Sequence, residues 1–289
     1  MIEKKHKTPG HPVIEYFLLA IFVNIFISLG SNLDVTLGRF IPGYITEMNV
    51  AGNTTKVASG IGAALGALIA AGIYKFLFRR RFEGYLVKGG LKIGLMMLAP
   101  FLVFHYIGSV VSWITFGIGS VSLAFLKALA PGFGEEIAFR GLGIANYMRT
   151  IRNEKSIPVI FWLSSIVFGL VHLLNAFVGG DPVAVAIQSV YAIGVGMLFG
   201  AVYLRTGNLW PTILGHFSVD FLEFIRGDLG ANAGVMTSIG IGDIITFAAA
   251  AFAAVWALKL MNKRYYPEIM EIWNKKWNKT DQAITGNTM

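Results

Sequence analysis

Apolar residues recur along this chain in runs about as long as a membrane is thick. Because about 20 apolar residues cross the hydrocarbon core of a bilayer, we expect about eight transmembrane helices. Their predicted ranges are 13–31, 56–78, 91–116, 118–149, 157–178, 182–204, 208–226 and 241–262. The fourth is expected to be broken or tilted. The predicted fold class is therefore all-α, a polytopic bundle of transmembrane helices.

The composition favours a membrane protein over a soluble one. Hydrophobic residues make up 55% of the 289 residues and charged residues only 14%, and the mean hydropathy is +0.64. An ordinary soluble domain carries roughly 25% charged residues. We therefore expect a multi-pass protein of the cell membrane or, in a eukaryote, of the endoplasmic reticulum membrane.

Basic residues gather in alternate connections between the expected spans. They cluster near 4–7, 75–88, 149–155, 205 and 259–264, whereas the intervening connections hold few. Short loops rich in Lys and Arg stay on the cytoplasmic side of a membrane, so both termini are expected there. The net charge of +8 is thereby assigned to helix orientation, and nucleic acid is not expected as a partner.

Few ionisable residues lie inside the expected spans. Burying a charge at membrane depth costs at least about 2.5–3.5 kcal/mol and is usually tied to function. The densest group interrupts the apolar run 131–141, where Glu135, Glu136 and Arg140 stand close together. These residues are the first candidates for chemistry.

The spacing of this group predicts two different roles. Glu136 and Arg140 are four residues apart and share a helical face, so we expect a supporting ion pair. Glu135 is rotated about 100° away and is free to act. Pro and Gly in 131–134 predict a helix break, which would place Glu135 in a first helical turn, where backbone amides favour a carboxylate.

Two further motifs place histidines on later helices. His172 follows Phe168 by one helical turn, and His216 forms an i, i+4 pair with Asp220. Three helices can thus bring Glu135 and these polar groups together, which satisfies the rule that buried polar groups need partners. Phe168 is expected to pack in the core or to form a wall of the site.

In this order, the patterns EExxxR, FxxxH and HxxxD resemble those of the CAAX-processing and bacteriocin-processing intramembrane proteases, which include the Rce1-type CAAX protease and the Abi proteins. The resemblance covers about 118–225. It implies an endopeptidase that activates water without a covalent intermediate. The implied roles are water activation by Glu135 and His172, completion of the site by His216 and Asp220, and support by Glu136 and Arg140.

One position departs from the Rce1-type pattern, since Asp220 stands where those members have Asn. An ionised Asp cannot donate a hydrogen bond to an oxyanion, so Asp220 would instead orient His216 or be protonated. The departure favours the Abi branch, whose members process peptides or confer immunity to bacteriocins. The partners implied are the lipid bilayer and a membrane-embedded or prenylated peptide.

Five regions follow from these patterns. They are a basic cytoplasmic N-terminus (1–12), N-terminal transmembrane helices with an outer amphipathic segment near 33–50 (13–117), a catalytic core (118–225), a last transmembrane helix (226–264) and a cytoplasmic tail (265–289). Trp and Lys residues in the tail predict a helix at the membrane interface.

Other chemistries stay open at this point. We expect no cofactor, but zinc is an alternative, with Glu135, His172 and His216 as its ligands. A proton-relay transporter or a non-enzymatic immunity scaffold would also keep acidic and imidazole groups inside the membrane. With no cysteine in the chain, thiol chemistry is excluded.

Two more protease types fit short motifs. The GxGD sequence at Gly240–Asp243 is typical of presenilin-like aspartyl proteases, with Asp220 as the second aspartate, although Asp243 is more simply read as a helix cap. Ser109 or Ser120 could serve a rhomboid-type serine protease, but no supporting motif accompanies them.

Overall fold

The computed structural model describes residues 11–38, 40, 46–50, 53–57, 60–78, 90–150, 153–178, 181–225 and 241–285. The α-helices are α1 (Pro12–Leu37), α2 (Ile61–Phe78), α3 (Gly90–Phe116), α4 (Val121–Leu129), α5 (Ala145–Thr150), α6 (Ser156–His172), α7 (Pro182–Thr206), α8 (Trp210–Phe224), α9 (Ile241–Leu260) and α10 (Tyr266–Thr285). A π-helix, η1 (Ala130–Ile144), joins α4 to α5. Two short 3₁₀ helices are η2 (Leu173–Val178) and η3 (Lys263–Tyr265).

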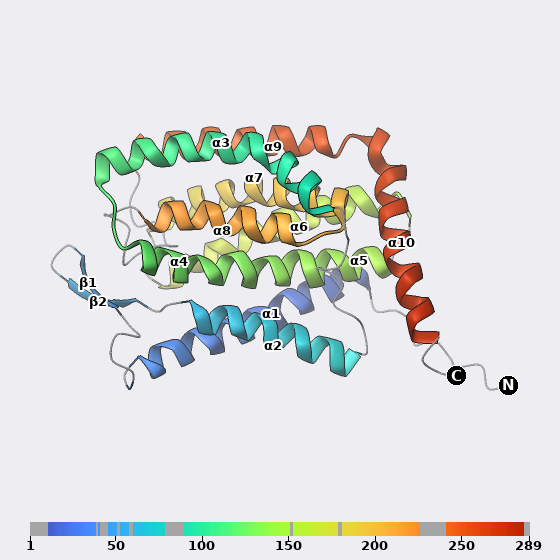
Figure 1. The fold of residues 1–289 in the computed structure, drawn as a ribbon, viewed down its shortest axis with the longest axis horizontal. Coiled ribbons are helices and arrows are strands. Elements are labelled where there is room, and N and C mark those ends of the chain that lie inside the picture. Colours follow the sequence, from blue (N-terminus) through green and yellow to red (C-terminus); the bar gives the residue numbers. More distant parts are fainter. Residues whose placement is uncertain are drawn as a thin grey trace.

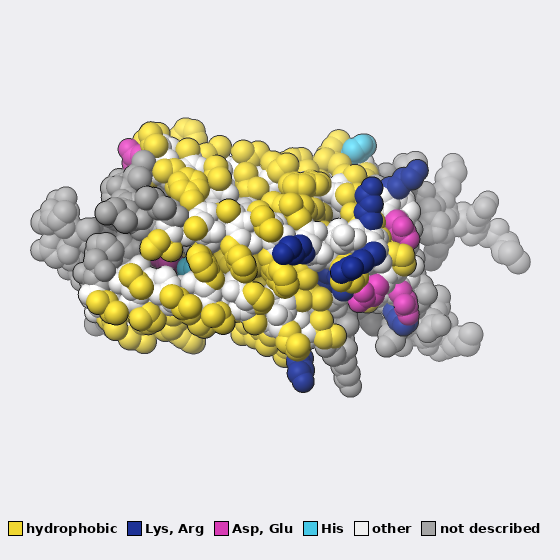
Figure 2. Space-filling view, turned by 90° about the horizontal axis from the view of Figure 1, so that it is seen from above, with side chains coloured by type: hydrophobic (Ala, Val, Ile, Leu, Met, Phe, Trp, Pro, Cys, Tyr) yellow, Lys and Arg dark blue, Asp and Glu magenta, His cyan; other side chains and the backbone are white. Residues whose placement is uncertain are grey.

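The helices form a membrane bundle, as predicted. Those from α1 to α9 run roughly along one common direction, and α10 lies across one end of the bundle (Figure 1). We call this end the α10 end and the opposite one the hairpin end. Hydrophobic side chains cover most of the face seen in Figure 2, as a lipid-facing surface requires.

Four helices of the described chain are long and apolar enough to cross a bilayer. They are α1, α3, α6 with the turn that follows it, and α7. Two shorter apolar helices lie at 61–77 and 247–260. The chain is therefore a membrane protein, while the number of about eight spans and the cytoplasmic termini stay predictions.

The outer amphipathic segment expected near 33–50 is not what the structure forms. Helix α1 continues to Leu37, and residues 46–50 instead make strand β1 (Thr46–Val50), which pairs antiparallel with β2 (Asn53–Val57). β-Branched Thr and Val suit such a hairpin. Arg39 and residues 41–45, the rest of the expected segment, lie outside the described residues.

Helices α1 and α2 touch through glycines. A Cβ added to Gly62 would lie 2.2 Å from the carbonyl oxygen of Gly30, and one added to Gly66 would lie 2.1 Å from that of Phe26. Small residues let membrane helices approach this closely. The fully buried Asp34 of α1 accepts a hydrogen bond from the amide of Gly62 at 2.8 Å, so it serves the N-terminal turn of α2.

The predicted C-terminal helix is present as α10 and docks on the end of α7. Buried Trp273 donates its indole N–H to the carbonyl of Leu204 at 2.9 Å. The ammonium of Lys276 donates to the carbonyl of Gly207 at 2.8 Å. These contacts satisfy carbonyl groups at the C-terminal end of α7 and cover the bundle at the α10 end.

We predict that Gly62→Ala destabilises the protein by about 1–3 kcal/mol, because its new methyl group meets backbone atoms that cannot move without separating α1 from α2. Thermal unfolding of purified protein in detergent measures the change. Gly72→Ala, on the same helix, is the matched control because no atom lies within 4 Å of its added Cβ. Equal melting of the two variants would contradict the packing described here.

Candidate active site

The two adjacent glutamates lie within an unbroken helix. The helical chain runs from Val121 through η1 to Thr150, so the break expected at 131–134 is wrong and Glu135 is not in the first turn of a helix. In π geometry each N–H binds the carbonyl five residues back. Inside a membrane helix, this local adjustment supplies hydrogen-bond partners for the backbone groups around Pro131. Such π segments are frequent at functional sites.

The predicted ion pair between Glu136 and Arg140 is present and fully buried. Nη1 of Arg140 lies 2.9 Å from Oε1 of Glu136, and Nη2 donates to the carbonyl of Gly196 on α7 at 3.3 Å. The guanidinium also stands 4.3 Å from the centre of the Phe168 ring, a cation–π contact. Each of these contacts helps to offset the cost of burying the charges.

His216 of α8 joins this pair. Its Nδ1 lies 2.9 Å from Oε1 of Glu136, and because a carboxylate only accepts hydrogen bonds, we assign the Nδ1 proton to His216. The rings of Phe168 and Phe199 stand 5.8 and 5.3 Å from the imidazole centre. The ring is therefore held in one orientation, with Nε2 directed away from Glu136.

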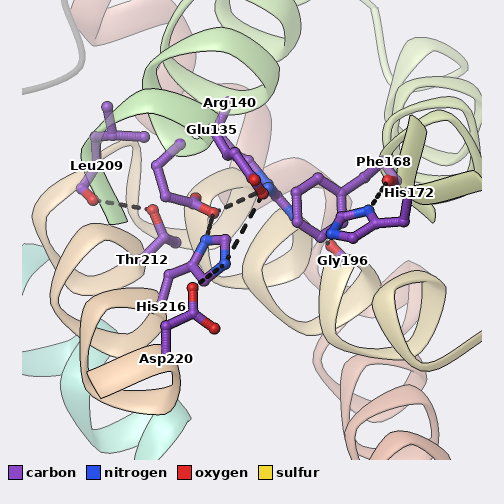
Figure 3. Close-up of polar contacts among 10 residues, drawn as sticks. Glu135, Arg140, Phe168, His172, Gly196, Leu209, Thr212, His216 and Asp220 are labelled. Carbon is purple, nitrogen blue, oxygen red and sulfur yellow. Dashed lines mark hydrogen bonds and ion pairs between the residues drawn. The ribbon is translucent and has the colours of Figure 1, made fainter. Parts of the chain in front are cut away.

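Nε2 of His216 faces two further carboxyl groups. It lies 3.4 Å from Oδ2 of Asp220 and 3.9 Å from Oε2 of Glu135, and Figure 3 shows these three side chains pointing toward one another. Glu135 and Glu136 thus face the same imidazole ring, Glu135 at Nε2 and Glu136 at Nδ1. The structure thus brings the second motif pair, His216 and Asp220, to the glutamate motif.

Glu135 is the carboxylate that the protein leaves available. Its Oε2 is buried and accepts no hydrogen bond from the described residues, while the side chain as a whole is 29% exposed. Glu136, by contrast, is fully buried and held by both Arg140 and His216. The structure therefore separates a fixed carboxylate from one that can meet another molecule.

His172 and Phe168 lie to one side of this group (Figure 3). Nδ1 of His172 is 2.8 Å from the carbonyl of Phe168, and their rings are 5.1 Å apart. No hydrogen bond or ion pair joins His172 to Glu135 in the described part of the chain, so the expected Glu135–His172 pair does not form directly. Buried Phe168 packs edge-on to both imidazoles, as a wall of the site would.

The residues on which the serine-protease and aspartyl-protease alternatives rest have different surroundings. Ser109 donates its hydroxyl hydrogen to the carbonyl of His105 at 3.0 Å, and Ser120 caps α4 by accepting from the amide of Leu123. Gly240 and the side chain of Asp243 lie outside the described residues. Among described residues, no group of three or more His, Asp or Glu has the arrangement of a metal site.

Sequence reasoning missed some polar contacts of the site. The bond from His216 to Glu136 was one, although a buried imidazole requires a partner. Another is the 2.9 Å hydrogen bond from Asn175 of η2 to Gln188 of α7. No spacing rule could have found these contacts, because each joins different helices.

Comparison with family models gives a match over the same core. Residues 117–222 match the model described as type II CAAX prenyl endopeptidase Rce1-like. This core of the chain is therefore similar to the Rce1-like family. The match contains the whole candidate site and supports a CAAX-type intramembrane protease as the general class. Searches of curated proteins and of solved structures found no match.

We predict that Arg140→Met destabilises the protein by about 3–5 kcal/mol, because it leaves the Glu136 carboxylate buried without its cation. Thermal unfolding in detergent measures the loss. The double variant Glu136→Gln with Arg140→Met removes both charges and should recover much of it. A single variant as stable as the wild type would show that the pair is not needed for folding.

Proposed function

We propose that this protein is an intramembrane endopeptidase that hydrolyses membrane-associated or lipidated peptides with a water activated by Glu135. The observation that carries the proposal is Oε2 of Glu135, which is buried, accepts no hydrogen bond from the described residues and lies 3.9 Å from Nε2 of an imidazole whose other nitrogen is fixed. A carboxylate in this state is suited to accept a proton from a bound water.

In the proposed reaction, Glu135 takes a proton from water as the oxygen attacks the peptide carbonyl. The carbonyl becomes a tetrahedral oxyanion, and its collapse breaks the C–N bond as a proton passes to the leaving amine. No acyl-enzyme forms. General-base assistance of this kind is typically worth about 10²–10⁴-fold in rate.

His216 is proposed as the hydrogen-bond donor to the developing charge. The carboxyl groups of Glu135, Glu136 and Asp220 surround its ring, and nearby negative charge favours the imidazolium. Since Nδ1–H is engaged by Glu136, the proton on Nε2 is the one that can reach the oxyanion or the leaving amine. Asp220, 3.4 Å from Nε2, would orient this ring, which explains how Asp can stand in place of Asn.

His172 is proposed to assist water activation. A backbone carbonyl only accepts hydrogen bonds, so the 2.8 Å contact with Phe168 assigns the proton to Nδ1 of His172. In the neutral ring Nε2 is then an acceptor. An acceptor suits the hydrogen of a water, whereas the oxyanion needs a donor, so the two histidines take different parts.

We predict that Glu135→Gln lowers peptide cleavage by at least about 10²-fold, since the amide keeps the shape but cannot take a proton. The assay compares cleaved membrane peptides, by mass spectrometry, from membranes holding either form. Glu271→Gln, an exposed change on α10, is the control and should cleave like the wild type. If the wild type cuts no peptide while Glu135→Gln abolishes solute movement or bacteriocin immunity, the protease proposal is wrong.

Metal dependence is tested on the same preparation. Because the proposed reaction uses carboxylate and imidazole groups alone, a strong chelator should leave the cleavage rate unchanged. Loss of cleavage that returns on adding zinc would instead assign Glu135, His172 and His216 as ligands of a catalytic zinc.

A further inference from the structure

Burial changes along the helices that form the site. On α7, every residue from Gly194 to Thr206 is buried, whereas exposed residues recur between Pro182 and Ile193. On η1, every residue from Glu136 to Ile144 is buried, whereas Glu135 and the residues just before it include partly exposed ones. The change occurs at the depth of the site on both helices.

Helix α8 shows the same change. In its first half His216 and most of the preceding residues are buried, and after His216 Val219 alone is buried before Ile225. Asp220 is 22% exposed and Glu223 is 38% exposed. The polar side chains of the site are thus followed by partly exposed residues in one direction along the bundle and by buried residues in the other.

The open direction is the hairpin end. The C-terminal end of α8 meets the α3–α4 connection, where the amide of Gly119 donates to the carbonyl of Ile225 and the indole of Trp113 donates to that of Leu222. Figure 1 places this connection at the end away from α10. An open apolar groove lined by Val121, Ser122, Phe125 and Leu126 lies on α4 at the same end.

The closed direction is the α10 end. Between the site and this end, Leu98 and Phe199 pack where a Cβ of Gly215 would stand. Trp273 of α10 then covers the end of α7. A peptide approaching from the α10 end would have to open this packed layer.

Basic residues mark the α10 end. Of the Lys and Arg side chains that the structure describes outside the buried ion pair, only Lys127 of α4 lies toward the hairpin end. Those toward the α10 end are Lys75, Lys92, Arg149, Lys155, Arg205, Lys259, Lys263, Arg264, Lys275 and Lys276. Figure 2 shows Lys and Arg gathered toward one end of the bundle.

The sequence of the connections has the same asymmetry. Those leading to the α10 end include the run Arg79, Arg80 and Arg81. Of those leading to the hairpin end, 117–120 and 173–181 hold no Lys or Arg, and the other two together hold only Arg39, Lys56 and Arg226. Lys and Arg in short loops remain in the cytoplasm. The α10 end is therefore the cytoplasmic end, and the hairpin end faces the other side of the membrane.

From these two asymmetries we infer that the site opens to the non-cytoplasmic side of the membrane. The inference rests on the proposed function and specifies its substrate class, namely a membrane-associated peptide whose scissile segment lies in the outer half of the bilayer or beyond it. A lipidated peptide confined to the cytoplasmic surface would meet the closed, basic end. Precursors of exported peptides have the required placement.

Single cysteines test this orientation without background, because the chain has none of its own. Asn153→Cys and Ala176→Cys flank α6, with both positions exposed and on opposite ends of the bundle. Neither change removes a basic residue that orients the chain. Ser218→Cys, partly exposed on α8 between His216 and Asp220 but on another helical face, reports on α8 at the depth of the site, and Ser122→Cys is a second probe of the hairpin end.

Intact cells expressing each full-length variant are treated with a membrane-impermeant maleimide, and labelling is compared before and after membrane disruption. We expect Ala176→Cys, Ser122→Cys and Ser218→Cys to react in intact cells and Asn153→Cys to react only after disruption. Reaction of Asn153→Cys in intact cells, or absence of reaction at every probe of the hairpin end, overturns the inference.

Cysteine labelling does not depend on peptide cleavage. A result can therefore contradict the proposed orientation without contradicting the proposed chemistry, and the reverse. If Glu135→Gln cleaves normally while the labelling pattern holds, the proposed chemistry is wrong and the orientation stands. If labelling is reversed while Glu135→Gln is inactive, the enzyme is a protease whose substrate comes from the cytoplasm.

Discussion

The buried ion pair between Glu136 and Arg140 is the interaction on which the site depends. Two charges removed from water are costly unless their geometry is good and their remaining hydrogen-bonding groups are engaged. Here the carboxylate also binds His216, and the guanidinium reaches Gly196 and the face of Phe168. These contacts join η1, α6, α7 and α8, the helices that carry or surround the candidate catalytic groups.

This requirement also explains why two adjacent glutamates can differ so much. Glu136 is fully buried and committed to the cation and to Nδ1 of the imidazole, whereas Glu135 is 29% exposed and stands 3.9 Å from Nε2 of the same ring. Support extends beyond the family core, because Tyr16 of α1 packs on η1 where a Cβ of Gly143 would lie 2.5 Å from its ring. The N-terminal helices thus hold η1 in place.

Sequence could predict what depends on short spacing and on the membrane. The Glu136–Arg140 pair needed only the i, i+4 rule, and the approach of His216 to Glu135 followed from the need of buried polar groups for partners. The π geometry could not be predicted, because Pro131 and the glycines beside it are typical of a helix break. The absence of direct contact between Glu135 and His172 depends on how α6 packs, which no single helix encodes.

Hydrolysis places opposite demands on neighbouring residues of η1. The ion pair is strongest where water is excluded, yet the proposed base must receive water for every peptide bond cut. Because Glu135 and Glu136 are adjacent, the boundary between the water-accessible and the water-excluded part of η1 must lie between them. Burial along η1 does change at this point. A bundle closed at one end and accessible from the other meets both demands. The side from which water reaches Glu135 is then also the side from which its peptide must come.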